Sequence, residues 1–488
     1  MTETKRRRER PDDYFADWKE REALAEAMIP LVGKLYRERN VKTYIYGHSL
    51  YNESVIDIMQ AHRTVRQVEE NELSEFEIYP VLKVLSQLEL GSAHIDVGRI
   101  AVNYEEGARG KGISVEDYVK SEVADLIGNN VKTHQPRDVV LYGFGRIGRL
   151  MARLLIEKAG GGENLRLKAV VVRPTGAKND LEKRVSLLRR DSVHGRFRGT
   201  IRIDEERQSF VANGNEVKVI HAAQPEDIDY TEYGINNAIV IDNTGAFRDD
   251  QALARHLSCK GVDKVILTAP GKNIKNIVFG INNDRIEESD KLISAASCTT
   301  NAISPPLKAI DDMFGIEFGH VETVHAYTND QNLIDNYHKA DRRGRSAALN
   351  MVLTETGAAK AVSKVMPQFE GKLTGNAIRV PTPNVSMALL NLTLKRETTV
   401  EELNEFMRQT ALHSDLRKQI DYSNSPEVVS TDFVGTRCAC IYDSVATIVT
   451  GRHAVVYLWY DNEFGYSCQV HRVLEQMAGV IYAKYPKR

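Results

Sequence analysis

Residues 139–160 read VVLYGFGRIGRLMARLLIEKAG, an apolar run followed by a glycine-rich turn and an amphipathic helical pattern. Gly143, Gly145 and Gly148 have the spacing G-x-G-x-x-G and stand where a strand should end and a helix begin. In that setting glycines permit a tight turn and let the backbone approach a pyrophosphate at the helix N-terminus. The stretch therefore predicts the first strand–helix step of a parallel sheet that binds a dinucleotide.

The apolar runs that follow continue this alternation of strand and helix. They occur at residues 165–172, 217–220, 238–241 and 265–267, with helical patterns between them. Such alternation is typical of a doubly wound parallel sheet of the Rossmann type, in the α/β class. We predict that the dinucleotide-binding domain covers residues 137–297 and is completed by a C-terminal helix at residues 462–488.

After residue 297 the strand pattern changes. Longer runs rich in β-branched residues occur at 321–326, 378–380 and 385–394. These runs predict a second domain of the α+β type with a mainly antiparallel sheet. We place this catalytic domain at residues 298–461.

Residues 1–136 read as a mostly helical N-terminal extension. Apolar residues recur there at helical spacing, and Asp12-Asp13, Asn52 and Ser114 with Asp117 supply helix-start signals. The segment has no phosphate loop, metal-ligand cluster or nucleophile–base pair. Two roles stay open: a regulatory or oligomerising extension, or a helical cap that covers part of the catalytic body.

The overall composition excludes several classes of function. The chain has 488 residues, of which 42% are hydrophobic and 27% charged, and its formal net charge is −2. Without a strong net charge we expect neither nucleic-acid nor membrane partners, and no apolar run reaches the roughly 18 to 20 residues that span a bilayer. The five cysteines are too sparse for a disulfide framework or a zinc site. A cytoplasmic protein without a metal cofactor is therefore expected.

Cys298 differs from the other cysteines because it follows an apolar run and opens a predicted helix. In SAASCTTN, residues 294–301, small residues expose the thiol, and the polar residues after it are typical of a helix start. Unpaired helix N–H groups there favour thiolate over thiol. His325, in the strand-to-loop stretch VHAYTNDQ, is a suitable base for such a thiol.

Hydroxyls and guanidiniums follow this histidine in quantity, which suits doubly charged phosphate groups. The residues concerned are Arg342, Arg343, Arg345, Thr354, Thr356, Lys360 and Arg379. A solvated charged surface is the alternative for each of them taken singly.

The end of the second predicted strand bears on the choice of cofactor. NAD-binding units of this kind usually place an acidic residue there for the ribose 2′-OH, whereas this chain has Arg173-Pro174. Because a guanidinium can pair with a 2′-phosphate, we predict that NADP is used at least as well as NAD. Alternatively, Arg173 faces solvent and Asp180 or another acid replaces the ribose ligand.

Residues 137–488 resemble the phosphorylating glyceraldehyde-3-phosphate dehydrogenase family along nearly their whole length. The matching motifs are YGFGRIGR, DSVHGRF, SAASCTTN, VHAYTNDQ, DRRGRSAALN, TGAAKAV, GKLTGNAIRVPTPNVS and WYDNEFGYS. The resemblance implies conversion of glyceraldehyde 3-phosphate, inorganic phosphate and NAD or NADP to 1,3-bisphosphoglycerate through a cysteine thioester, in glycolysis or gluconeogenesis. It also implies a homotetramer. The N-terminal extension lies outside the resemblance.

The resemblance assigns roles by position. Cys298 would attack the aldehyde, and His325 would act as base and acid. Thr328 and Arg379 match the residues that hold the substrate's phosphate. The attacking phosphate would be held by Ser297, Thr299, Thr356 and Gly357, with Arg343 as a further contributor. The cofactor contacts would come from Gly143, Gly145, Arg146, Ile147, Gly148, Arg173, Thr268, Asn462 and Tyr466.

Three positions depart from the family pattern. Arg173-Pro174 replaces the acidic ribose ligand, Ala222-Ala223 stand where an acid–arginine pair often lies near the adenine, and Ala302 replaces a second cysteine. The first two concern the adenosine end of the cofactor and leave the chemistry unchanged. Two other functions stay open: an erythrose-4-phosphate dehydrogenase, and a regulatory or scaffold protein that acts through its N-terminal extension.

Overall fold

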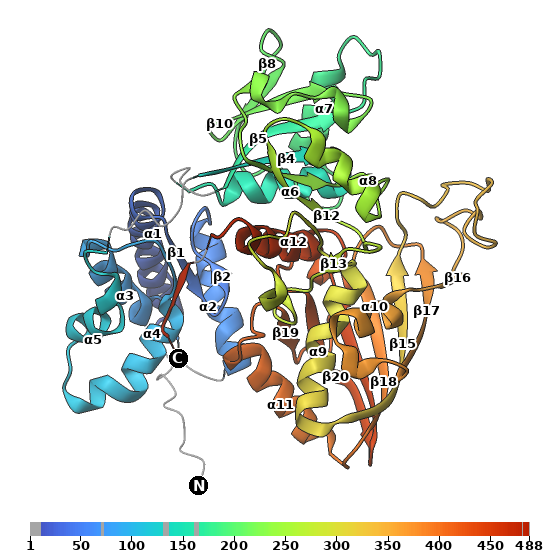
Figure 1. The fold of residues 1–488 in the computed structure, drawn as a ribbon. Helices are drawn as coiled ribbons and strands as arrows, with labels where there is room; N and C mark the ends of the chain where they lie inside the picture. Colours follow the sequence, from blue (N-terminus) through green and yellow to red (C-terminus); the bar gives the residue numbers. More distant parts are fainter. Residues whose placement is uncertain (1–10, 70–72, 130–135, 161–164, 481, 488) are drawn as a thin grey trace. The chain divides into compact units, whose positions relative to one another are not determined.

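The computed structural model describes residues 11–69, 73–129, 136–160, 165–480 and 482–487. The chain divides into two compact units, many of whose elements are labelled in Figure 1. Unit 1 comprises Met1–Gln135, Ala159–Asn164 and Val480–Arg488, and unit 2 comprises Pro136–Lys158 and Leu165–Gly479. Unit 1 is thus built from both ends of the chain, and unit 2 is inserted between them.

Unit 1 combines helices with a small sheet. Its helices are α1 (Tyr14–Arg39), α2 (Val55–Glu69), α3 (Glu75–Gln87), α4 (Val97–Asn103) and α5 (Val115–Glu122). Its sheet has the order β2-β1-β3-β22 and consists of β1 (Val41–Ile45), β2 (His48–Ser49), β3 (Ala93–Asp96) and β22 (Ala483–Tyr485). β1, β3 and β22 are parallel, whereas β2 pairs antiparallel with β1. The predicted helical region is confirmed, and the sheet was not predicted.

The helices of unit 1 begin at capping residues and bury one apolar face. The Asp13 carboxylate accepts hydrogen bonds from the backbone N–H groups of Phe15 and Ala16 at the start of α1, as the sequence suggested. Ser74 and Glu77 form a capping box at the start of α3. Side chains such as Met28 and Leu82 are fully buried in the core of this unit. Unit 1 therefore has a hydrophobic core of its own.

The first sheet of unit 2 has nine strands in the order β13-β14-β12-β11-β4-β5-β10-β9-β8. The strands are β4 (Arg137–Tyr142), β5 (Leu165–Val172), β8 (Ile201–Asp204), β9 (Ser209–Ala212), β10 (Asn215–His221), β11 (Ala238–Asp242), β12 (Val262–Leu267), β13 (Lys275–Asn276) and β14 (Leu292–Ser294). The pairs from β13 to β10 are parallel, whereas β9 pairs antiparallel with both β10 and β8. The strand order reverses between β4 and β11, and ligands of such sheets bind at this point beyond the carboxyl ends of the strands.

The helices of this half are α6 (Arg146–Glu157), α7 (Asp180–Arg189) and α8 (Asp250–Ala254), and a short β6–β7 ribbon joins Arg190–Asp191 to Gly195–Arg196. Gly143 has a positive φ of 93° at the turn into α6. A Cβ at Gly148 would lie 2.2 Å from the Gly143 carbonyl oxygen, so a larger residue would push α6 away from β4. The glycine motif thus forms the predicted tight turn and, in addition, allows the close packing of strand and helix.

The second sheet of unit 2 has seven strands in the order β16-β17-β15-β18-β21-β20-β19. They are β15 (Ile316–Ala326), β16 (Val352–Glu355), β17 (Leu373–Val380), β18 (Ser386–Leu394), β19 (Ile420–Ser423), β20 (Cys440–Thr450) and β21 (His453–Tyr460). Only the β15–β17 and β19–β20 pairs are parallel, so the predicted mainly antiparallel sheet is confirmed.

Helices α9 (Cys298–Phe314), α10 (Ala358–Val365) and α11 (Val400–His413) cover one face of this sheet (Figure 1). Ile303 and Leu307 of α9 are fully buried against sheet residues such as Leu390 and Leu392. Burial of this kind stabilises by about 1.5 to 3 kcal/mol for each large apolar side chain. The core therefore fixes the direction in which α9 presents its first residue.

The C-terminal segment contains one helix, α12 (Phe464–Met477), which packs on α6. It ends at Met477, and Gly479, two residues later, has a left-handed φ of 72° that stops helical propagation. The sequence predicted helix for the whole of residues 462–488, but residues 483–485 instead form β22 beside β3 in unit 1.

Across the described residues, no helix combines the length and the hydrophobicity needed to cross a lipid bilayer. The same residues contain no group of three or more histidine, cysteine or acidic side chains placed to hold a metal ion.

Candidate active site

Cys298 is the first residue of α9, directly after the parallel sheet ends at Ser294. Ser297 caps this helix, because its Oγ accepts a hydrogen bond of 3.0 Å from the backbone N–H of Thr300. Ala296, in the linking turn, has a positive φ of 55°, an uncommon conformation for a residue other than glycine. Tyr466 holds this turn by donating from its hydroxyl to the Ala296 carbonyl oxygen at 2.8 Å. The thiol is therefore presented by a constrained turn.

His325 is the partner of this thiol. It lies near the end of β15, is 5% exposed, and places Nε2 3.5 Å from the Cys298 Sγ. Its Nδ1 lies 2.7 Å from the Ala326 carbonyl oxygen and 2.8 Å from Nη1 of Arg379. With the proton on Nδ1, that nitrogen donates to the carbonyl and leaves Nε2 free to accept the thiol proton. The predicted nucleophile and base are thus in contact.

Burial and the nearby charge of Arg379 lower the pKa of His325 to about 3. The imidazole is therefore neutral at pH 7 and has the form of a base. Burial also raises the pKa of the Cys298 thiol, against the positive charge of Arg379 and hydrogen bonds from Thr299. The sequence-based expectation of a thiolate considered the helix N–H groups alone, whereas burial acts in the opposite direction and outweighs them. A proton transfer from Sγ to Nε2 would then generate the nucleophile.

Tyr460 fixes the relative positions of nucleophile and base. Its hydroxyl lies 3.0 Å from the Thr299 hydroxyl on α9 and 2.7 Å from the Thr323 hydroxyl on β15. Tyr460 is 1% exposed, and burial raises the pKa of its hydroxyl. One buried phenol thus joins the helix that carries Cys298 to the strand that carries His325. The sequence analysis did not single out Tyr460, although this residue lies within the quoted motif WYDNEFGYS.

Ser386 joins the base to the predicted cofactor residue Asn462. The backbone N–H of Ala326 donates to Ser386 Oγ at 3.1 Å, and Ser386 Oγ donates to Asn462 Oδ1 at 2.9 Å. Because Oδ1 is used in this way, the amide nitrogen of Asn462 remains as the donor. Sequence reasoning also missed Ser386, whose role depends on the pairing of β18 with β15 and β21.

The predicted substrate-phosphate ligands lie beside the base. Arg379 donates from Nη1 to the Ala326 carbonyl oxygen at 2.9 Å, while Thr328 and Arg343 both contact the carboxylate of Asp330. The Nε atoms of Arg343 and Arg379 are buried and have no hydrogen-bond partner within the described part of the chain. These donors fit an anion with several oxygens.

Thr356 and Gly357, predicted for the attacking phosphate, precede α10. The Thr356 hydroxyl accepts a hydrogen bond of 3.2 Å from the backbone N–H of Ala358. Because α10 packs on α9, its N-terminal residues belong to the same side of the sheet as the cysteine helix. Of the other cations noted in the sequence, Arg345 is instead a largely exposed partner of Asp335.

Most of the residues predicted for the cofactor follow strands of the parallel sheet: residues 143–148 follow β4, Arg173 follows β5 and Thr268 follows β12. A Cβ added to Gly145 would meet no atom within 4 Å, so this backbone leaves room for a pyrophosphate at the start of α6. Arg146 and Ile147 are the first residues of α6, and the guanidinium of Arg146 forms ion pairs with Asp191 and Glu463. Because these ion pairs occupy the guanidinium, the backbone N–H of Arg146 is the group that could bind a phosphate. The backbone and the turn therefore fit a dinucleotide.

Thr268 follows β12 and anchors the neighbouring loop. Its hydroxyl donates to the Asp242 carbonyl oxygen at 2.9 Å. The Asp242 carboxylate is buried between His256, at 2.9 Å from Nε2, and the hydroxyl of Thr244 at 2.7 Å. These hydrogen bonds thus fix the loop that follows β11.

Arg173 follows β5 and its side chain is exposed. Asp180, the alternative ribose ligand, already accepts hydrogen bonds from Thr175 at 2.7 Å and from Arg184 at 2.6 Å, and it lies 2.9 Å from His221 Nε2. These partners hold the pKa of its carboxyl far below the ordinary value, against the effect of burial. Asp180 is therefore engaged in a local network.

Arg255 supplies a cation close to the Ala222-Ala223 departure. Its guanidinium lies 5.3 Å from the ring centroid of Phe247 and pairs with Glu226 and with the side-chain oxygen of Gln224. The sequence did not reveal this residue, because it comes from the end of α8 rather than from the segment in which an arginine was sought.

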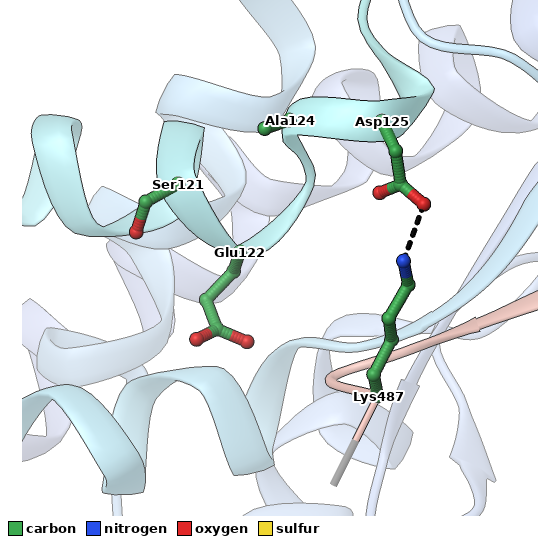
Figure 2. A pocket seen from close by; sticks show the side chains of 5 residues that line it. All are labelled: Ser121, Glu122, Ala124, Asp125 and Lys487. Carbon is green, nitrogen blue, oxygen red and sulfur yellow. Dashed lines mark hydrogen bonds and ion pairs between the residues drawn. The ribbon is translucent and has the colours of Figure 1, made fainter.

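Unit 1 has a shallow pocket, shown in Figure 2. It is lined by Ser121, Glu122, Ala124, Asp125 and Lys487, and an ion pair joins Asp125 to Lys487. The lining offers no nucleophile–base pair comparable with Cys298 and His325. We therefore assign the chemistry to unit 2.

Comparisons with known proteins match the same body. Residues 137–250 match the model "Glyceraldehyde 3-phosphate dehydrogenase, NAD binding domain", and residues 297–462 match "Glyceraldehyde 3-phosphate dehydrogenase, C-terminal domain". A "Glyceraldehyde-3-phosphate dehydrogenase-like protein" of Pseudomonas aeruginosa is 61% identical over 94% of this chain and 100% of its own length. "Glyceraldehyde-3-phosphate dehydrogenase 2" of Bacillus subtilis is 41% identical over 70% of this chain and 96% of its own. The Pseudomonas relative thus also covers most of the segment before residue 137.

Replacing Arg379 with glutamine should raise the pKa of Cys298 further, because the change removes the cation that favours the thiolate. Less thiolate is then present at any given pH, so iodoacetamide should alkylate Cys298 more slowly at pH 7. The rate–pH curve should therefore move to higher pH. Alkylation followed at Cys298 by mass spectrometry measures this, with Arg452→Gln as a matched control. An unchanged curve would show that Arg379 does not act on the thiol.

Proposed function

Because the chain belongs to the glyceraldehyde-3-phosphate dehydrogenase family, we propose that it oxidises glyceraldehyde 3-phosphate with inorganic phosphate and NAD or NADP to 1,3-bisphosphoglycerate. The family membership makes it a nicotinamide-dependent oxidoreductase. The observation that carries the proposal is the contact of 3.5 Å between Cys298 Sγ and His325 Nε2, beside arginines with unused donors. A thiol, a base and anion ligands are the components that this reaction needs.

In the proposed reaction, His325 Nε2 takes the proton of Cys298 and the thiolate attacks the aldehyde carbon. His325 then returns this proton to the former carbonyl oxygen, which gives a hemithioacetal and a neutral imidazole. His325 then accepts the hemithioacetal hydroxyl proton as the carbon is oxidised to a thioester on Cys298. The nicotinamide cofactor supplies the hydride acceptor when it is bound. Inorganic phosphate attacks the thioester carbon, the C–S bond breaks, and the released thiolate takes the proton held by His325. The acyl phosphate leaves, and the thiol of Cys298 and the neutral His325 are regenerated.

The other proposed roles follow from position. Thr328 and Arg379 hold the substrate's phosphate, and Ser297, Thr299, Thr356 and Gly357, with Arg343, hold the attacking phosphate. Gly143, Gly145 and the first N–H groups of α6 hold the pyrophosphate, while Asn462 donates to the nicotinamide carboxamide beside Tyr466. Residues 137–297, with the C-terminal helix, would bind the cofactor, and residues 298–461 would carry catalysis. The place in glycolysis or gluconeogenesis and a cytoplasmic location stay predictions.

Cys298→Ser should abolish phosphate-dependent NADH formation from glyceraldehyde 3-phosphate, because the hydroxyl is a much weaker nucleophile than the thiolate. His325→Asn should lower kcat by about 10²- to 10⁴-fold, since it removes the base. Cys438→Ser, which changes a cysteine outside the site, is the matched control and should keep full activity. Steady-state assays with glyceraldehyde 3-phosphate and erythrose 4-phosphate separate the two candidate substrates. If the unaltered protein oxidised neither aldehyde, the proposal would be wrong.

We propose NADP use because Arg173 stands where an acidic ribose ligand is usual and Asp180 is held by Arg184, His221 and Thr175. An exposed guanidinium can pair with a 2′-phosphate and offers nothing to accept a hydrogen bond from a ribose hydroxyl.

Arg173→Asp should therefore weaken NADP binding by about tenfold or more, since it replaces an attraction to the 2′-phosphate by a repulsion. NAD binding should be unchanged or stronger. Equilibrium titrations with both cofactors measure this, with Arg202→Asp, at an exposed arginine on β8, as the matched control. If the unaltered protein turned over NADP a hundredfold more slowly than NAD, the proposal would be wrong.

We also propose a homotetramer, supported by the loop that follows β15. Five apolar side chains there are more than 70% exposed: Leu333 (78%), Ile334 (74%), Tyr337 (89%), Leu349 (82%) and Met351 (77%). A concentration of exposed apolar residues of this kind marks an interaction surface. Its occupant, on this proposal, is a second copy of the chain.

The double change Leu333→Ser with Tyr337→Ser should therefore lower the mass of the particle in solution, because it removes apolar area from the interface. Sedimentation equilibrium measures that mass. Phe15→Ser, which alters an exposed aromatic residue of unit 1, is the control and should leave the tetramer intact. A monomeric unaltered protein would contradict the proposal.

A further inference from the structure

Asp330 lies among the residues proposed to hold the substrate's phosphate. It belongs to the loop that follows β15, and its Oδ1 accepts a hydrogen bond from the Thr328 hydroxyl. Its Oδ2 forms an ion pair with Nη2 of Arg343 and lies 3.8 Å from Nε2 of His338. One carboxylate thus uses the hydroxyl of one phosphate ligand and the guanidinium of another.

The carboxylate does not satisfy this cluster of donors. Nε of Arg343 and Nε of Arg379 are buried without a partner among the residues that the structure describes. A carboxylate has two oxygens, whereas a phosphate monoester presents three with a larger charge. The donors around Asp330 therefore match a phosphate better than the side chain that they contact.

Asp330 is charged and able to move. Burial raises its pKa, but the Thr328 hydroxyl and the charges of Arg343 and Arg379 together hold the pKa below the ordinary value. Its side chain is 47% exposed, so that rotation into solvent needs no rearrangement of the core.

We propose that Asp330 is an internal competitor of bound phosphate, for Thr328 of the substrate-phosphate site and for Arg343, assigned above to the attacking phosphate, and that it sets how tightly the site holds phosphorylated molecules. This inference rests on the proposed function, because it assumes that the phosphate of the aldehyde substrate competes with the Asp330 carboxylate for these donors. A bound phosphate has to take over the hydroxyl and the guanidinium, and it is repelled by the carboxylate that remains nearby.

The competition has a consequence for turnover. Substrate and acyl-phosphate product carry the same terminal phosphate, so every contact that tightens substrate binding also slows product release. The Asp330 carboxylate weakens the binding of substrate and of product equally, and it returns to the same donors when the product leaves. Asp330 is thus a specificity residue that limits affinity, while Thr328, Arg343 and Arg379 provide it.

Asp330→Asn tests the proposal, because the amide keeps the size and the acceptor oxygen and removes the charge. The probe is glycerol 3-phosphate, which carries the phosphate and no reactive aldehyde, titrated by calorimetry into the full-length protein. We expect its Kd to fall by about three- to tenfold, with a larger thermal stabilisation by the same ligand.

Two further variants make the result specific. Asp335→Asn removes a carboxylate of the same loop that pairs with Arg345, and it should leave the Kd unchanged. Asp330→Glu keeps the charge and should stay within about twofold of the unaltered protein.

Unchanged or weaker binding of glycerol 3-phosphate by Asp330→Asn would overturn the proposal, since Asp330 would then serve to position Arg343. The proposed function fails differently: the unaltered protein would bind glycerol 3-phosphate without oxidising glyceraldehyde 3-phosphate. The two failures are therefore distinguishable.

Discussion

The start of α9 is the constraint on which the rest of the site depends. At Ser294 the last inner strand of the parallel sheet ends, and at Cys298 the helix that supports the antiparallel sheet begins. The thiol therefore stands at the junction of the sheet that fits a dinucleotide and the sheet that carries His325. Tyr466 holds the turn before the cysteine, and Tyr460 holds the turn after it. A displacement of α9 would separate the nucleophile from its base and from the cofactor's side of the molecule together.

Arg379 gives this junction its electrostatic character. The charge of one guanidinium favours the thiolate of Cys298 and disfavours protonation of His325, so it assists the nucleophile and keeps the imidazole neutral while weakening it as a base. Its Nε remains a donor for an anion. Charge on a bound phosphate would partly offset that of Arg379 and make protonation of His325 easier, which links the occupancy of the phosphate site to the strength of the base. Binding and proton transfer are in this way coupled through a single side chain.

The sequence predicted the parts of the structure that rest on local pattern. The doubly wound sheet followed from apolar runs around a glycine turn, and the antiparallel sheet followed from long β-branched runs. The sequence predicted Cys298 as the nucleophile and His325 as its base, but the distance between the two side chains depends on how β15 and α9 pack. Tyr460 and Ser386 were missed because each acts by joining segments far apart in the chain. The raised pKa of Cys298 was missed because burial is a property of the packed site and not of the helix start alone.

The sheet of unit 1 shows the same limit and alters the meaning of the N-terminal extension. β22, near the end of the chain, pairs with β3 in the register Ala483 to Ala93, and Tyr485 is 3% exposed in the core of unit 1. No local pattern could reveal a pairing across so many residues, and closing it has an entropic cost that grows slowly with length. The sheet is complete only when the last residues of the chain are present. Shortening the chain to residues 137–488 would therefore leave β22 without its neighbour and expose Tyr485. Unit 1 is accordingly not a detachable N-terminal arm but a domain that the first and last segments of the chain build together.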